Sequence, residues 1–132
     1  MNYLLDTNIV SYHLKQNQKI RQYLKEAKIA KHNIFISCIT YYEIKRGLLY
    51  ANATTKITLF NDFVSQYEIL FLNENILEKA CEIHANLKRQ GRMIQDADIL
   101  IAATAIIHDL ILVSNDSDLT IISEVNLENW LT

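Results

Sequence analysis

Acidic residues recur in this 132-residue sequence where short apolar segments end or begin. Asp6 directly follows an apolar segment, and Asp116 lies three residues after another. Glu43 lies about one helical turn after a third apolar segment, and Asp98 stands at the start of a fourth. A carboxylate at any one of these places is a typical helix N-cap or turn residue. The repetition of the pattern indicates in addition that the four side chains share a chemical role.

Carboxylates gathered in one cleft would repel one another and raise each other's pKa. A divalent cation removes this penalty, because it supplies the compensating charge. A ligand set made of oxygen atoms suits Mg²⁺ or Mn²⁺ better than zinc. Such a site can orient and deprotonate a water molecule and neutralise the charge that develops on a phosphodiester during an in-line displacement.

The elements that would position these acids are short strands alternating with helices. Apolar segments typical of strands lie at residues 1–5, 34–37, 68–72 and 110–113. Helical spacing of apolar residues predicts helices at 8–14, 20–29, from 40 onward, 54–65, 76 to about 90, and 98–108. This alternation predicts an α/β protein with a parallel sheet covered on both faces. The carboxyl ends of parallel strands lie along one edge, where ligands bind, so acids far apart in sequence would meet there.

Two helix ends have local signals. Thr40 and Glu43 match a capping box and predict that a helix begins at Thr40. Gly91 follows the apolar helical pattern and predicts a stop after about residue 90.

Composition bounds the function classes. Half of the residues are hydrophobic, which excludes a disordered tail, and the net charge of −2 excludes a strongly cationic, histone-like binder. Residues 1–66 contain nine basic and four acidic side chains, whereas residues 67–132 contain four basic and eleven acidic ones. This asymmetry fits a nuclease with an acidic pocket beside a basic surface, and it equally fits ordinary scatter of surface charge. With no proline and no low-complexity linker, residues 1–132 are expected to form a single domain.

Cysteine usage and the terminal segment bear on the compartment. Cys38 and Cys81 lie far apart and suggest neither a zinc site nor a disulfide; we expect both to be small buried hydrophobes. The sequence begins without the basic and apolar regions of a signal peptide. Its most apolar stretch, residues 99–107, is far shorter than the ~20 residues that span a bilayer. A cytoplasmic protein without a membrane association is therefore expected.

Five segments resemble the motifs of the PIN-domain family, most closely those of VapC-type toxins. They are LLDTN at 4–8, YEIKRG at 42–47, DADILIAATA at 96–105, LVSND at 112–116 and LENW at 127–130. The resemblance covers essentially the whole chain in the right order. It implies a three-layer α/β/α sandwich with a short, mostly parallel central sheet. It also implies a metal-dependent endoribonuclease, a homodimer, and a VapB-type antitoxin that blocks the active-site groove.

The resemblance assigns roles to the acids. Asp6, Glu43 and Asp98 match the three central acids and Asp116 the more variable fourth, which together would hold one or two Mg²⁺ ions, with Mn²⁺ as a substitute. Supporting positions are Thr7, Asn8, Asp96 and Ser114. Asp96 is a ligand, an outer-sphere group or a helix cap, and Asp118 competes with Asp116 for the fourth role.

The expected substrate is RNA, with tRNA or another structured RNA as the candidate target and inhibition of translation as the consequence. The resemblance implies products with 5′-phosphate and 3′-hydroxyl ends. Lys45 and Arg46 follow Glu43 within one helical turn and could contact RNA phosphates; an exposed helix surface is the alternative. Two other functions stay open: a PIN-domain ribonuclease of RNA processing, and a catalytically inactive RNA-binding module. A phosphoryl-accepting receiver-like domain is remote, because the sequence has no Asp-Asp pair near its start.

Overall fold

A five-stranded sheet runs through the centre of the molecule. The structure, a computed structural model, describes residues 1–132. The strands lie in the order β3-β2-β1-β4-β5, and every neighbouring pair is parallel. Their bounds are β1 (Asn2–Leu5), β2 (Asn33–Ser37), β3 (Glu68–Leu70), β4 (Ile111–Val113) and β5 (Asn126–Glu128). The carboxyl ends of all five strands therefore lie along the same edge.

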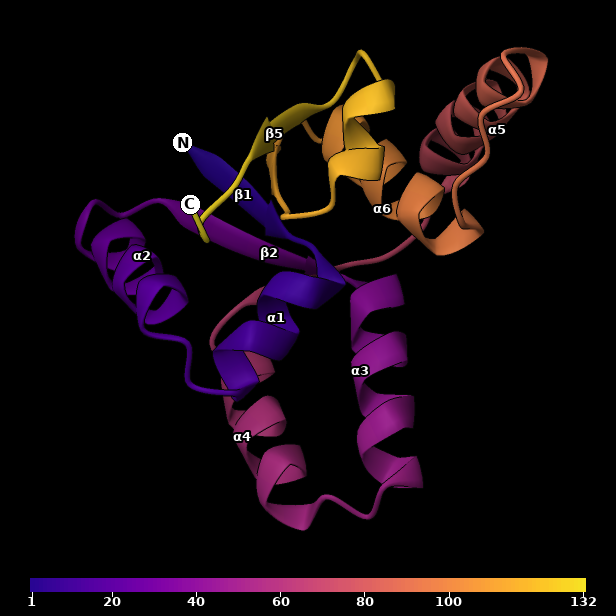
Figure 1. Ribbon diagram of the computed structural model, residues 1–132. Coiled ribbons are helices and arrows are strands. Elements are labelled where there is room, and N and C mark those ends of the chain that lie inside the picture. Colours follow the sequence, from indigo (N-terminus) through magenta and orange to yellow (C-terminus); the bar gives the residue numbers. More distant parts are fainter.

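Helices cover both faces of this sheet. They are α1 (Thr7–Leu14), α2 (Gln18–Ile29), α3 (Cys38–Tyr50), α4 (Thr54–Ser65), α5 (Glu74–Arg89), α6 (Asp96–Ile107) and the 3₁₀ helix η1 (Ser117–Ile121). Figure 1 shows α1 to α4 on one side of the strands and α5 and α6 on the other. The predicted three-layer α/β/α architecture is thus confirmed. No helix is both long enough and apolar enough to cross a membrane.

The core is divided into two clusters by the sheet itself. Successive strand residues point to opposite faces. Accordingly, Leu4 packs in the cluster of α5 and α6, while Leu5 packs in the cluster of α1 to α4. Helix α6 is buried along most of its length, with Ile101 fully buried, because it lies between the sheet and α5. Two adjacent leucines thus fix β1 between both helical layers and set the position of Asp6, the next residue.

The C-terminal segment is held by aromatic packing. The indole of Trp130 stacks on Tyr23 of α2, with ring centroids 5.0 Å apart, and meets Tyr3 of β1 edge-on at 5.3 Å. Only 1% of Trp130 is exposed, and its Nε1–H donates to Glu128 at 2.8 Å. This residue therefore connects β5, β1 and α2.

Helix α3 begins before the residue that the capping pattern predicted. Its N-cap is Ser37, the last residue of β2, whose hydroxyl accepts from the Ile39 N–H at 3.0 Å. Thr40 lies inside the first turn and is fully buried. The capping-box prediction is wrong because Ser37 offers an earlier side-chain oxygen at the point where the strand ends. Gly91, with φ of 69°, lies directly after the C-cap of α5, as predicted.

The structure differs from the sequence prediction at one strand and at one cysteine. Strand β5 was not predicted, because three residues of sequence Asn-Leu-Glu carry neither an apolar run nor a β-branched residue. Cys81 is exposed on α5 rather than buried, since it lies beside the apolar stripe of that helix and not within it; Cys38 is half-buried.

Candidate active site

The four predicted acids meet at the carboxyl edge of the sheet. A cavity of about 440 Å³ is lined by Asp6, Glu43, Asp98 and Asp116 together with Asp118. Asp6 follows β1, Glu43 lies in α3, Asp98 in the first turn of α6, and Asp116 in the loop after β4. We call this cavity the acidic cleft. Asp6 and Asp118, which are 112 positions apart in the sequence, are thus brought to one cleft by the parallel sheet.

Asp6 is fixed on three sides. Its backbone N–H donates to the Val113 carbonyl at 2.9 Å, which extends the β1–β4 pairing to the end of the strand. One carboxylate oxygen accepts from the Thr7 N–H at 2.8 Å and so caps α1; the other accepts from the Ser114 hydroxyl at 2.7 Å. Only 3% of the residue is exposed. Asp6 is therefore both a helix cap and a lining residue of the cleft.

Glu43 is held by a chain of two threonine hydroxyls. The Thr7 hydroxyl donates to Glu43 Oε1 at 2.8 Å, and its oxygen lies 3.0 Å from the hydroxyl of Thr40. Because Thr7 has a single hydroxyl proton, which it gives to Glu43, Thr40 is the donor in the second bond. Proton donation thus runs from Thr40 through Thr7 to Glu43, and each bond polarises the next.

The loop after β4 positions Asp116. The Ser114 oxygen, which donates its proton to Asp6, accepts from the Asp116 N–H at 3.0 Å. The Asp116 carboxylate accepts from the Asp118 N–H at 2.9 Å and caps η1. Ser114 therefore links the first and the fourth acid of the pattern.

Burial and mutual repulsion perturb two of the carboxyls. The pKa of Asp98 is raised from 3.8 to about 6, first by desolvation and then by the charges of Asp6, Asp116, Glu43 and Asp118. Desolvation also raises the pKa of Asp6, with smaller increases from Asp116 and Glu43, against the opposing hydrogen bonds from Ser114 and Thr7. The acids are thus close enough to destabilise one another's ionised forms.

The donor set of the cleft suits a hard divalent cation. Its charged lining consists of carboxylates alone, and their mutual repulsion is the penalty that such an ion relieves. No three of the side chains are close enough in their present conformations to hold an ion together. The residues therefore fit a metal by their chemistry and their common cleft, and the carboxylates would have to draw together to bind it.

The other predicted site residues divide into two groups. Thr7 and Asn8 line the cleft, and Ser114 lies buried behind Asp6. Asp96 does not line it; this residue is exposed in the first turn of α6. Lys45 and Arg46 do not line it either.

The side chains of both basic residues are engaged along the helix surface. Lys45 Nζ donates to Asn61 of α4 at 2.6 Å, and the Arg46 guanidinium lies 4.9 Å from the centre of the Tyr42 ring. Both cations thus lie outside the acidic cleft, and their contact with RNA phosphates stays a prediction.

Sequence reasoning missed two features of the site. The capping pattern predicted Thr40 as a helix cap, whereas its hydroxyl lies 3.0 Å from that of Thr7. A helix that starts at Cys38 places Thr40 one turn before Glu43 on the same face of α3, and this spacing could have indicated its role. Residues 93–95 also line the cleft, and their loop carries no motif that could have indicated this.

Comparisons with known proteins agree with this geometry. The family model of the PIN domain matches residues 3–125. Ribonuclease VapC2 of Haemophilus influenzae is 32% identical over 133 residues, which cover 99% of each chain.

Solved structures match over nearly the whole chain as well. One chain in the crystal structure of VapBC2 from Rickettsia felis, bound to a DNA fragment from its promoter, superimposes with a TM-score of 0.92. It is 28% identical, and the match covers 98% of this chain and 99% of that one. The DNA-bound VapBC structure from Salmonella typhimurium gives a TM-score of 0.91 at 25% identity, with 98% of both chains covered. The family-model match from β1 to the segment before β5, on a fold with these acids at its carboxyl edge, shows that the chain belongs to the PIN-domain family.

Proposed function

We propose that this protein is an endoribonuclease of the VapC type, a toxin that hydrolyses RNA and is neutralised by a VapB-type antitoxin. One observation carries the proposal: four acids from four separate elements line a single cleft, in a chain that aligns end to end with a VapC ribonuclease. The homodimer and a structured RNA such as tRNA, both expected from the sequence, belong to the proposal as well.

Asp6, Glu43, Asp98 and Asp116 would hold one or two divalent cations, Mg²⁺ by preference and Mn²⁺ as a substitute. When bound, the cation supplies the positive charge that lowers the pKa of water and neutralises the phosphodiester oxygens. Asp118 lines the same cleft but is exposed, so we assign the fourth role to Asp116, which Ser114 fixes in place.

The remaining polar residues orient the acids. The Thr7 N–H and the Ser114 hydroxyl each hold one oxygen of the Asp6 carboxylate and so fix its orientation. The Thr7 hydroxyl holds Glu43, and Thr40 keeps the Thr7 hydroxyl from rotating towards any other acceptor. We expect these three hydroxyl groups to limit the rearrangement that ion binding requires.

The charge of the cleft also controls access of the substrate. Without a cation, five carboxyl groups face any RNA phosphate that approaches, and like charges repel strongly at short range. Productive binding of the scissile phosphodiester in the cleft therefore requires the cation that the acids attract.

Incubation of the purified protein with labelled tRNA tests this function directly. We expect cleavage with Mg²⁺ or Mn²⁺, no cleavage with a chelator, and inhibition by a small antitoxin encoded directly upstream. Asp6→Asn should abolish cleavage, whereas Asp96→Asn is the matched control because Asp96 lies on α6 outside the cleft. Equal cleavage by wild type and Asp6→Asn would refute the assignment, and cleavage without any adjacent antitoxin gene would favour a role in RNA processing.

A further inference from the structure

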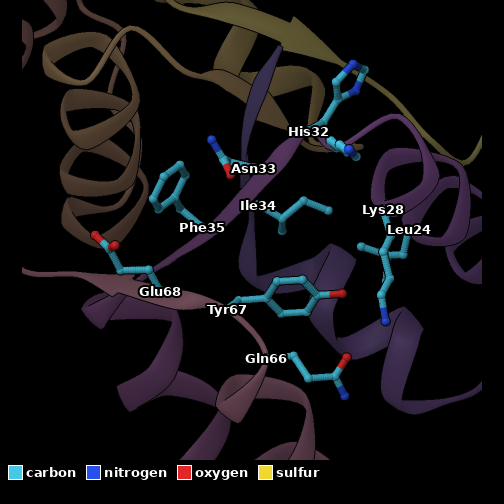
Figure 2. Close-up of a pocket in the computed structure, with 10 residues that line it drawn as sticks. Leu24, Lys28, His32, Asn33, Ile34, Phe35, Gln66, Tyr67 and Glu68 are labelled. Atoms are coloured by element: carbon cyan, nitrogen blue, oxygen red, sulfur yellow. The ribbon is translucent and has the colours of Figure 1, made fainter.

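A second cavity lies at the opposite, amino edge of the sheet. Strand β3 pairs with β2 only from Phe35 onward, where Phe35 is opposite Glu68. Residues 33 and 34 of β2 therefore have no neighbouring strand on that side. The space left open by the short β3 forms a cavity of about 720 Å³ between the end of α2, the start of β2 and residues 66–68 (Figure 2).

The walls of this cavity differ in charge. Lys28, Lys31 and His32 line it from the side of α2 and the turn that follows. Figure 2 shows Glu68, the one carboxylate of the lining, on the opposite side from Lys28 and His32. We call the cavity with its cationic wall the basic notch.

Neutral hydrogen-bonding groups complete the notch. Tyr67 lies between Ile34 and Gln66, with its hydroxyl directed towards the side that Lys28 lines (Figure 2). Burial raises the pKa of Tyr67, so its hydroxyl is a proton donor at neutral pH. The amides of Asn33 and Gln66 add further donors and acceptors.

The cations beside the notch have no carboxylate partners. Five basic residues lie on α2 and the turn after it: Lys19, Arg21, Lys25, Lys28 and Lys31. The two ion pairs of the molecule both belong to Lys79 of α5. These cations are exposed and form no ion pairs, and α2 carries a single acid, Glu26. The helix therefore has a net positive charge, and Lys28 and Lys31 bring positive charge to the notch.

We propose that the basic notch and the adjoining face of α2 form a second RNA-binding site, which holds phosphate groups of the substrate away from the scissile bond. The proposal rests on the proposed function, since it concerns the same substrate. Lysines that contact phosphates beside an aromatic ring are typical of surfaces that bind RNA strands. The five residues of β2 span about 17 Å through the sheet at 3.3 Å per residue. Because helices cover both faces of the sheet, an RNA that contacts both edges must pass over a helical layer, and the proposal therefore concerns a structured RNA rather than a short strand.

An RNA-binding measurement in the presence of a chelator isolates the notch from the cleft. The test variant is Lys28→Gln with Lys31→Gln, and the matched control is Lys88→Gln with Arg89→Gln at the end of α5. We expect the test variant to bind labelled tRNA about 10-fold more weakly at 0.1 M salt. Affinity falls as salt rises, and the loss of two phosphate contacts should make the negative slope of log affinity against log salt shallower by about 1.4. The control should match the wild type, and the difference should shrink for a four-nucleotide RNA.

Unchanged tRNA affinity in the test variant, or an equal loss in the α5 control, would overturn the proposal. Unchanged RNA affinity combined with weaker antitoxin binding would assign the notch to an acidic protein instead. The two proposals fail separately. If the wild type cleaves no RNA but the test variant loses RNA affinity and salt dependence, the notch binds RNA and the proposed nuclease activity is wrong. If cleavage is normal and the RNA affinity of the test variant is unchanged, only the proposal about the notch is wrong.

Discussion

The two edges of the sheet handle charge in opposite ways. At the carboxyl edge, Asp6 is buried and hydrogen-bonded, and burial together with the charges of nearby acids raises the pKa of Asp6 and of Asp98. At the amino edge, Lys28 and Lys31 are exposed and without ion pairs. The acidic cleft is therefore organised by the fold at an electrostatic cost that a cation can relieve. The basic notch has no comparable electrostatic repulsion, and its lysines can bind a phosphate without a metal ion.

This contrast could not be read from the division of charge along the sequence. The basic half of the chain, residues 1–66, contains Asp6 and Glu43 of the cleft as well as the lysines of the notch. Opposite ends of parallel strands, rather than opposite halves of the chain, separate the two charges. The comparison predicts that substitutions at one edge change chemistry and those at the other change affinity.

The largest effect should follow from Asp6→Asn. We expect RNA cleavage to fall by more than about 100-fold, beyond the loss typical of groups that only orient a ligand. Affinity for tRNA in a chelator should stay within about 2-fold of the wild type, because the notch is intact. Cleavage rates and filter binding measured side by side check this. An equal loss of cleavage rate and tRNA affinity would contradict the assignment of catalysis to the carboxyl edge and RNA binding to the amino edge.

A smaller effect is expected from Thr40→Val, which removes one buried hydroxyl at almost constant volume. Thr7 then loses its donor and can rotate away from Glu43, so Mn²⁺ affinity measured by calorimetry should fall about 10-fold. Thr40→Ser keeps the hydroxyl and should restore most of that affinity. A loss of melting temperature without a change in Mn²⁺ affinity would show that Thr40 serves packing alone.

The smallest effect concerns stability of the metal-free protein. The pKa of Asp98 is raised from 3.8 to about 6 on folding, so the folded protein holds this proton more tightly than the unfolded chain. Its ionisation therefore destabilises the fold as the pH rises through that range. At pH 7.5 in a chelator, Asp98→Asn should raise the free energy of unfolding by about 1 kcal/mol, after allowance for solvent screening. This corresponds to a melting temperature that is a few degrees higher.

The pH and the metal sharpen this last test. At pH 4 the gain should nearly vanish, because the wild-type carboxyl is then protonated in the folded state. Adding Mg²⁺ should stabilise the wild type and not the variant. The exposed neighbour Asp96→Asn is the control and should change the melting temperature less; an equal gain there would contradict the repulsion within the cleft.

Prediction from sequence succeeded where one local pattern determined the outcome. The apolar runs around Leu4 and Leu112 set the parallel strands, and parallel strands bring Asp6 and Asp116 to one edge. The family motifs led to the same acids and to the architecture that the comparisons confirm. Cap prediction failed at Thr40, because a helix start depends on which of several nearby oxygens first meets a free N–H, and Ser37 does so here.

The basic notch could not be predicted because it depends on a mismatch in length. Its opening exists only because β3 begins two residues after β2 does in their shared register. A pattern of apolar residues locates strands to within several positions, which is too coarse to reveal such an offset. The lysines of α2 were visible in the sequence, but their proximity to Tyr67 follows from tertiary packing.

The sandwiching of Trp130 between Tyr3 and Tyr23 provides a built-in optical probe. It is the sole tryptophan of the chain, so fluorescence excited selectively at tryptophan comes from one position, next to the helix that carries Lys28 of the notch. Emission will shift to longer wavelength when water reaches the indole, and so will report detachment of α2 or of the last strand. Unlabelled protein can thus be followed by fluorescence while RNA or a second protein is titrated against it.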